Sequence, residues 1–203
     1  MQKIMFTDRY GLTQAVIEGR KTMTRREVPW TITEEWMELV SDTPRVDGVY
    51  VPESEKDFYE RKAPRYKIGE VVAVAQSYKN IGYSDTALDK DPDDVLKIRG
   101  SLRQSKGWNN KLFVRAELML RRIRITGVHC ERLQDISDSD CLKEGIRYMP
   151  QIGKFYFEDV LREEGFYFND HREAFAALID KVSGRGTWKR NPWVVVYEFK
   201  VVE

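Results

Sequence analysis

Residues 19–26 read Gly-Arg-Lys-Thr-Met-Thr-Arg-Arg, and this signature segment directly follows a stretch with helical periodicity. Gly19 stands where a residue in the left-handed conformation commonly ends a helix. Three apolar residues before it have helical spacing, namely Leu12, Ala15 and Val16. The chain is therefore expected to leave a short helix at Gly19 and to enter an extended or looped run.

The signature segment carries four cations and two hydroxyl groups within eight residues. A solvated basic turn is one interpretation of such a segment. A regular strand over the whole segment is another, and it would place Lys21 and Thr24 on opposite sides. Joint action of these two side chains in one site therefore requires a turn between them.

The composition describes a folded chain without bulk basicity. It has 203 residues, 41% hydrophobic and 12% aromatic, and a net charge of +1 despite a charged fraction of 33%. This length predicts one domain, residues 1–203, and any nucleic-acid surface has to be a local patch. We expect a soluble, cytoplasmic protein without a membrane partner, because no signal peptide and no long apolar run occurs. Cys130 and Cys141 are too few to indicate a disulfide framework or a metal site, and no cofactor is expected.

Strands and helices are predicted from apolar periodicity and from capping residues. Apolar runs or alternation predict strands near residues 3–6, 70–76, 112–120, 123–131 and 193–202. The alternation shifts by one position after Leu120, which predicts a bend at Arg121-Arg122 and makes these arginines candidates for the mouth of a ligand site. Two further helices are predicted by their N-caps, one after Ser137 and one over 171–183 after Asp170.

Three segments between these elements are expected to be insertions packed around the single domain. They lie near residues 27–64, 77–110 and 147–169. The first is expected to contain one short helix near 34–40. Residues 89–94, within the second, are expected to form a solvated loop.

Four blocks of the chain resemble the ASCH family, a branch of the PUA-like β-barrels. The first is the signature segment, and the second is Tyr-Lys-Ile-Gly-Glu at 66–70. The third is Arg-Leu-Gln-Asp-Ile-Ser at 132–137 with Glu-Gly-Ile at 144–146, and the last is Asn-Pro-Trp-Val-Val at 191–195. The overall pattern is most similar to ASCH proteins encoded by bacteria and their phages.

The resemblance implies an α+β fold, a PUA-like, partly closed β-barrel with short flanking helices and long loop insertions. It also implies recognition of RNA or of a modified nucleoside in a basic cleft. The cleft is expected to have residues 70–76 as its floor and the signature segment with Glu144 as its rim. The residues expected to contact the ligand are Arg20, Arg25, Arg26, Arg121, Arg122 and Trp108.

The alternative function implied by the resemblance is amide hydrolysis of N4-acetylcytidine. The positions that match the catalytic residues of such family members are Lys21, Thr24 and Glu144. A threonine hydroxyl needs a base to accept its proton, and a lysine serves as that base when burial or neighbouring cations lower its pKa. Glu144 would hold the lysine or pass a proton to the leaving cytosine amine. A third possibility, binding of a protein partner, leaves no recognisable trace in the sequence.

Overall fold

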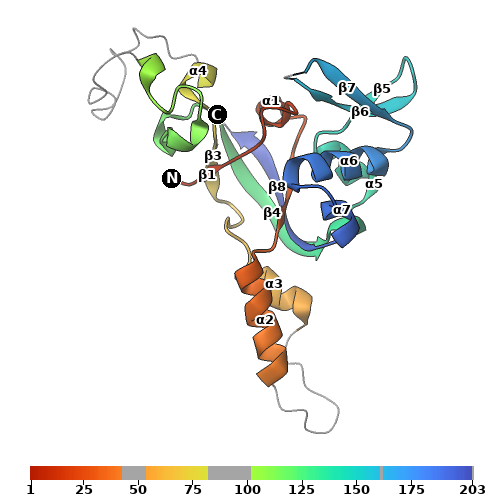
Figure 1. Cartoon of the computed structure of the whole chain (residues 1–203). Helices are drawn as coiled ribbons and strands as arrows, with labels where there is room; N and C mark the ends of the chain where they lie inside the picture. Colours follow the sequence, from red (N-terminus) through yellow and green to blue (C-terminus); the bar gives the residue numbers. More distant parts are fainter. Residues whose placement is uncertain (43–53, 82–101, 161, 203) are drawn as a thin grey trace.

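The computed structural model describes residues 1–42, 54–81, 102–160 and 162–202 (Figure 1). The expected loop at 89–94 lies outside these ranges. A five-stranded sheet forms the centre, and a three-stranded sheet lies to one side with several helices. The α+β class predicted from the sequence is confirmed.

The central sheet has the strand order β1-β3-β4-β8-β2. These strands are β1 (Lys3–Ile4), β3 (Val71–Val74), β4 (Arg122–Arg132), β8 (Trp193–Val202) and β2 (Met23–Glu27). β1 pairs with β3 in parallel, and the other three pairings are antiparallel. The predicted barrel is not closed, because β1 and β2 are the edges of the sheet and no described ladder joins them.

The long ribbon of β4 and β8 contains the predicted irregularity, at a different position. Ile125 pairs with Phe199 and Gly127 pairs with Glu198, so Thr126 is the additional residue. The bend predicted at Arg121-Arg122 is therefore wrong, since Arg122 already pairs regularly with Val202. A bulge absorbs one extra residue and increases the local twist of the strand.

The predicted strand at 112–120 is also wrong. This segment forms two 3-10 turns, Lys111–Phe113 and Ala116–Leu118, and another such turn occurs at Leu102–Gln104. Its buried side chains form a second small core with β3 and with α4 (Tyr78–Ile81). Apolar alternation in this segment therefore reflects packing against β3 rather than a strand.

The second sheet is built from the insertion near 147–169. It consists of β5 (Arg147–Met149), β6 (Lys154–Asp159) and β7 (Glu164–Phe168), all antiparallel. The helix α6 (His171–Ser183) packs against β6 and β7. Between these two strands, the ring of Phe157 stacks on that of Phe166, with 5.0 Å between the ring centroids. The aromatic side chains of the insertion thus extend the main core.

The remaining helices begin and end at residues with clear capping roles. Gly19 has φ +73° and follows α1 (Leu12–Ile17), as predicted. Ser137 accepts a hydrogen bond from the Asp140 amide at the start of α5 (Asp138–Lys143), and Asp170 caps α6 in the same way. The short 3-10 turn Leu133–Asp135 precedes α5, and α7 (Thr187–Arg190) precedes β8.

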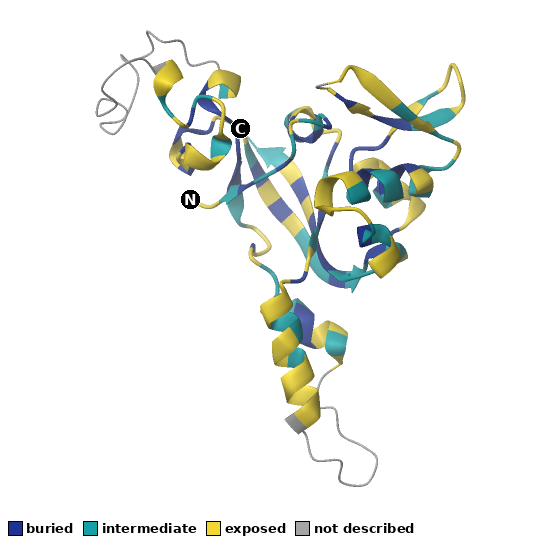
Figure 2. Ribbon diagram, in the orientation of Figure 1, coloured by how far each residue is buried: buried dark blue, intermediate teal, exposed yellow. Residues whose placement is uncertain are grey.

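The insertion near 27–64 forms an arm that projects from the sheet (Figure 1). It contains two helices, α2 (Trp30–Asp42) and α3 (Glu55–Lys62), where one short helix was predicted. The arm packs through Trp36, Phe58 and Tyr59, while most of α2 is exposed (Figure 2). Phe58 and Tyr59 belong to the main core, which lies between the central sheet and the helices beside it.

Candidate functional site

The signature segment bridges α1 and β2 and is attached to α5. After the left-handed turn at Gly19, the Lys21 amide donates to the carbonyl of Ala15, and the Thr22 amide donates to the carbonyl of Lys143. β2 begins only at Met23. Lys21 thus precedes the strand, so the alternation that would separate it from Thr24 does not apply.

Lys21 is buried against the C-terminal end of α5. Its side chain is 2% exposed, and Nζ donates to Oε2 of Glu144 at 2.5 Å and to the Glu144 carbonyl at 2.8 Å. Gly145 follows with φ +106°, and a Cβ there would lie 3.0 Å from Leu12 and 3.7 Å from Lys21. The glycine therefore lets the end of α5 approach the lysine closely.

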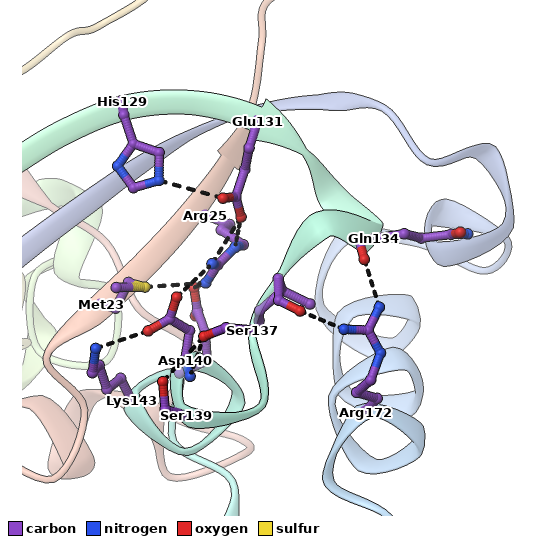
Figure 3. A network of polar contacts seen from close by, with 12 residues as sticks. Met23, Arg25, His129, Glu131, Gln134, Ser137, Ser139, Asp140, Lys143 and Arg172 are labelled. Carbon is purple, nitrogen blue, oxygen red and sulfur yellow. Dashed lines mark hydrogen bonds and ion pairs between the residues drawn. The ribbon is translucent and has the colours of Figure 1, made fainter.

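Arg25 uses the other oxygen of the same carboxylate. Its Nη1 donates to Oε1 of Glu144 at 3.0 Å, and its Nε donates to Oε1 of Glu131 at 2.8 Å. Asp140 lies 3.5 Å from the guanidinium (Figure 3). Three carboxylates thus surround Arg25, and His129 contacts the second oxygen of Glu131 at 3.3 Å.

Burial lowers the pKa of Lys21 below its ordinary value of 10.5. Glu144 opposes this shift, whereas the positive charges of Arg26 and Arg25 add to it. Glu144 compensates Lys21 only in part, because its carboxylate also serves Arg25. A lysine with a lowered pKa is more often in its neutral form near neutral pH, and only the neutral amine can act as a general base.

Thr24 and Arg26 have fewer partners than their neighbours. The Thr24 side chain is buried, and its hydroxyl has no hydrogen-bond partner among the described residues. Arg26 donates to the Met5 carbonyl and lies over the Phe6 ring, 5.5 Å from its centroid. Arg26 therefore spans the space between the segment after β1 and the edge strand β2.

These side chains line one cavity of about 260 Å³, the first cavity. Its polar side consists of Lys21, Thr24, Arg25, Arg26, Glu27 and Glu144. Its apolar side comes mainly from α6 and includes Phe6, Leu12, Phe175, Leu178, Ile179 and Val182. A polar wall opposite an apolar wall suits a small planar ligand with hydrogen-bonding groups on one edge.

The three predicted catalytic residues and two of the six predicted ligand contacts thus meet at the first cavity. The predicted floor is wrong, because none of residues 70–76 lines it: β4 and β8 separate β3 from β2. The apolar wall was not anticipated, since the helical spacing of Phe175, Leu178 and Val182 had indicated only a core face. Nothing in the sequence marked Glu131 or Asp140 as partners of Arg25.

The other four predicted contacts lie away from the first cavity. Arg20 is exposed and pairs with Glu18 at 2.5 Å. Arg122 pairs with Val202 at the start of β4. His129, which contacts the Arg25 partner Glu131, lies seven residues further along the strand, a distance of more than about 20 Å at roughly 3.4 Å per residue. Arg121 precedes that strand end, and Trp108 packs against the second small core.

Comparisons of the chain with protein-family models, with curated proteins and with solved structures gave no match. Within the described ranges, no three His, Cys, Asp or Glu side chains gather in a way that could hold a metal ion. Of the helices described, none combines the length and apolar character needed to cross a membrane. The chemistry of the site therefore has to be argued from its own residues.

Proposed function

We propose that the first cavity recognises a single modified nucleoside. The observation that carries this proposal is that Lys21 and Thr24 line one cavity of about 260 Å³ together with Glu144, which lies 123 residues from Lys21 in the sequence. A cavity of this size accommodates a nucleobase with a small substituent rather than a length of strand. The unpartnered Thr24 hydroxyl and the Arg26 guanidinium are available to the polar edge of a base.

The same residues support placing the chain in the ASCH branch of the PUA-like fold. The signature segment lines the first cavity with Glu144 and pairs with β8, so parts of three of the four resembling blocks lie close together. The edges β1 and β2 approach each other through Arg26 without pairing, which is compatible with a PUA-like sheet that stays open at one seam.

A groove for an RNA strand has less support than a pocket for one nucleoside. The cations expected to form such a groove, Arg20, Arg121 and Arg122, do not line the first cavity, and neither does Trp108. Strand binding without sequence preference requires a continuous basic track with stacking aromatic side chains.

The experiment is a calorimetric titration with N4-acetylcytidine, cytidine and uridine. We expect the modified nucleoside to bind most tightly, and Thr24→Val to weaken it about three- to tenfold through loss of one hydrogen bond. Arg20→Gln is the matched control, because it changes an exposed residue of the same segment. Equal affinity for all three nucleosides, or equal loss in Arg20→Gln, would overturn the proposal.

The second candidate function is hydrolysis of the acyl group of N4-acetylcytidine. It is favoured by the lowered pKa of Lys21 and by the Thr24 hydroxyl, which lines the same cavity and has no hydrogen-bond partner among the described residues. Thr24 Oγ1 would attack the acyl carbonyl carbon while Lys21 takes the hydroxyl proton. The tetrahedral intermediate would then expel the cytosine amine, which receives a proton from Lys21 or through Glu144. Water would release acetate and restore Thr24.

Chromatography of the reaction mixture separates this candidate from recognition alone. Hydrolysis predicts release of cytidine by the wild type, and a loss of about a thousandfold or more in Thr24→Val and Lys21→Met. Nucleoside binding without any release of cytidine would leave recognition as the function and remove hydrolysis.

A further inference from the structure

A second cavity adjoins the first one, and the two have Arg26 and Glu27 in common. It has a volume of about 280 Å³ and lies between the first residues of the chain and the segment that precedes β3. Its aromatic wall consists of Tyr66 and Tyr197, whose rings are 5.3 Å apart. A ligand in the first cavity could therefore extend past Arg26 without leaving the protein surface.

Arg26 is a partly buried cation without a counter-ion among the described residues. Among the described residues, no carboxylate lies within ion-pairing distance of it, and its one hydrogen bond goes to the Met5 carbonyl. Burial lowers the pKa of its guanidinium, and the charge of Glu144 offsets this only in part. Buried charges in proteins are normally paired, so a guanidinium without a carboxylate is suited to an anionic ligand.

The charges around the two cavities also favour an anion. The linings contain five cations, Lys3, Lys21, Arg25, Arg26 and Arg65, against the two carboxylates Glu27 and Glu144. Glu27 is itself held by Arg190 in two contacts, at 2.9 and 3.3 Å. Because Glu131 and Asp140 also pair with Arg25, the excess of positive charge lies at the second cavity, where Lys3, Arg26 and Arg65 line the wall with Glu27 as the one carboxylate of that lining.

We propose that the two cavities form one nucleotide site, with the base in the first cavity and a phosphate group held by Arg26 in the second. This inference rests on the proposed function and names its ligand class as phosphorylated nucleosides rather than free ones. A planar guanidinium binds phosphate through two parallel hydrogen bonds, and Arg65 at the exposed rim adds a second cation. The phosphate is either the terminal group of a mononucleotide or a phosphodiester in RNA.

The test compares three ligands that are not hydrolysed. They are N4-methylcytidine, its 5′-monophosphate, and a trinucleotide with the same base at its centre. The wild type is expected to bind a phosphorylated ligand at least about tenfold more tightly than the nucleoside. A preference for the mononucleotide indicates the terminal phosphate, and a preference for the trinucleotide indicates RNA. In Arg26→Gln the gain from phosphate is expected to disappear, whereas Arg20→Gln should retain it.

Two further measurements distinguish the loss of phosphate binding from unfolding of the variant and from failure of the proposed function. If circular dichroism shows that Arg26→Gln is unfolded, the Arg65→Gln variant tests the inference in its place. This variant is expected to bind the phosphorylated ligands about threefold more weakly and the nucleoside with unchanged affinity. Broadening of the phosphorus resonance of inorganic phosphate reports on the anion site alone. Arg26-dependent broadening without nucleoside binding would refute the proposed function and support the anion site. Nucleoside binding without any gain from phosphate would refute the inference and leave the proposed function intact.

Discussion

Arg25 and Arg26 are neighbours on β2, yet their surroundings are opposite. Arg25 contacts Glu131 and Glu144 directly and has Asp140 nearby. Burial alone would lower its pKa, but Glu144 and Glu131 raise it above its ordinary value. Arg26 has no carboxylate partner among the described residues, and burial lowers its pKa. The difference indicates that one arginine serves the structure of the site while its neighbour is available to a ligand.

We expect the largest effect on stability from removing the carboxylate of Glu144, which pairs with both Lys21 and Arg25. Glu144→Ala leaves Lys21 and Arg25 buried without this partner, which costs about 3–5 kcal/mol. For a chain of this length the melting temperature should fall by roughly 10 °C. Glu158→Ala is the control, since its pairing with Arg147 is exposed and its loss should cost less than about 1 kcal/mol. Similar losses in both variants would contradict the pairing of Glu144 with Lys21 and Arg25.

Replacing each arginine with methionine tests whether Arg25, and not Arg26, contributes to the stability of the fold. Arg25→Met removes the cation shared by three carboxylates and should cost about 2–3 kcal/mol, reduced from a fully buried pair because Glu131 and Asp140 are partly exposed. Arg26→Met breaks no ion pair and should change stability by less than about 1 kcal/mol. Urea unfolding measures the stability of both variants. An equal loss of stability for the two substitutions would contradict the different roles assigned to Arg25 and Arg26.

The smallest effect is the pH dependence that comes from Lys21. Its pKa is lowered in the folded protein, so between that value and 10.5 the unfolded chain binds a proton that the folded chain does not. Stability relative to Lys21→Met should therefore rise with pH through this window and be lowest below it. Denaturant unfolding of both proteins between pH 6 and 10 measures the difference. A difference that stays constant, or that falls as pH rises, would contradict the lowered pKa.

Local signals in the sequence predicted local structure well. Gly19, Ser137 and Asp170 mark the ends of helices, because left-handed glycines and side-chain caps depend on a few neighbouring residues. The strand over 193–202 was predicted with its boundaries, since a continuous apolar run over 193–197 is followed by further apolar residues at 199, 201 and 202. The alternation at 112–120 misled because this segment of 3-10 turns buries Val114, Ala116 and Leu118, which have the spacing of one face of a strand.

The site depends on contacts that local patterns do not determine. Lys21 and Glu144 are 123 residues apart, and their pairing was expected only from the family resemblance. The partners of Arg25 depend on the register of β2 and β8 and on the position of α5. The sequence of the signature segment determines neither of them. The apolar wall of the first cavity depends in the same way on where α6 packs.

The most direct test of the central claim is a crystal structure of the Thr24→Val variant soaked with N4-acetylcytidine. The substitution keeps the shape of the side chain and removes the hydroxyl that would consume the ligand. We predict the base in the first cavity, with its acyl group beside residue 24 and Lys21, and with the α6 side chains against its ring. A ligand bound elsewhere, with the first cavity still empty, would contradict the assignment of this site.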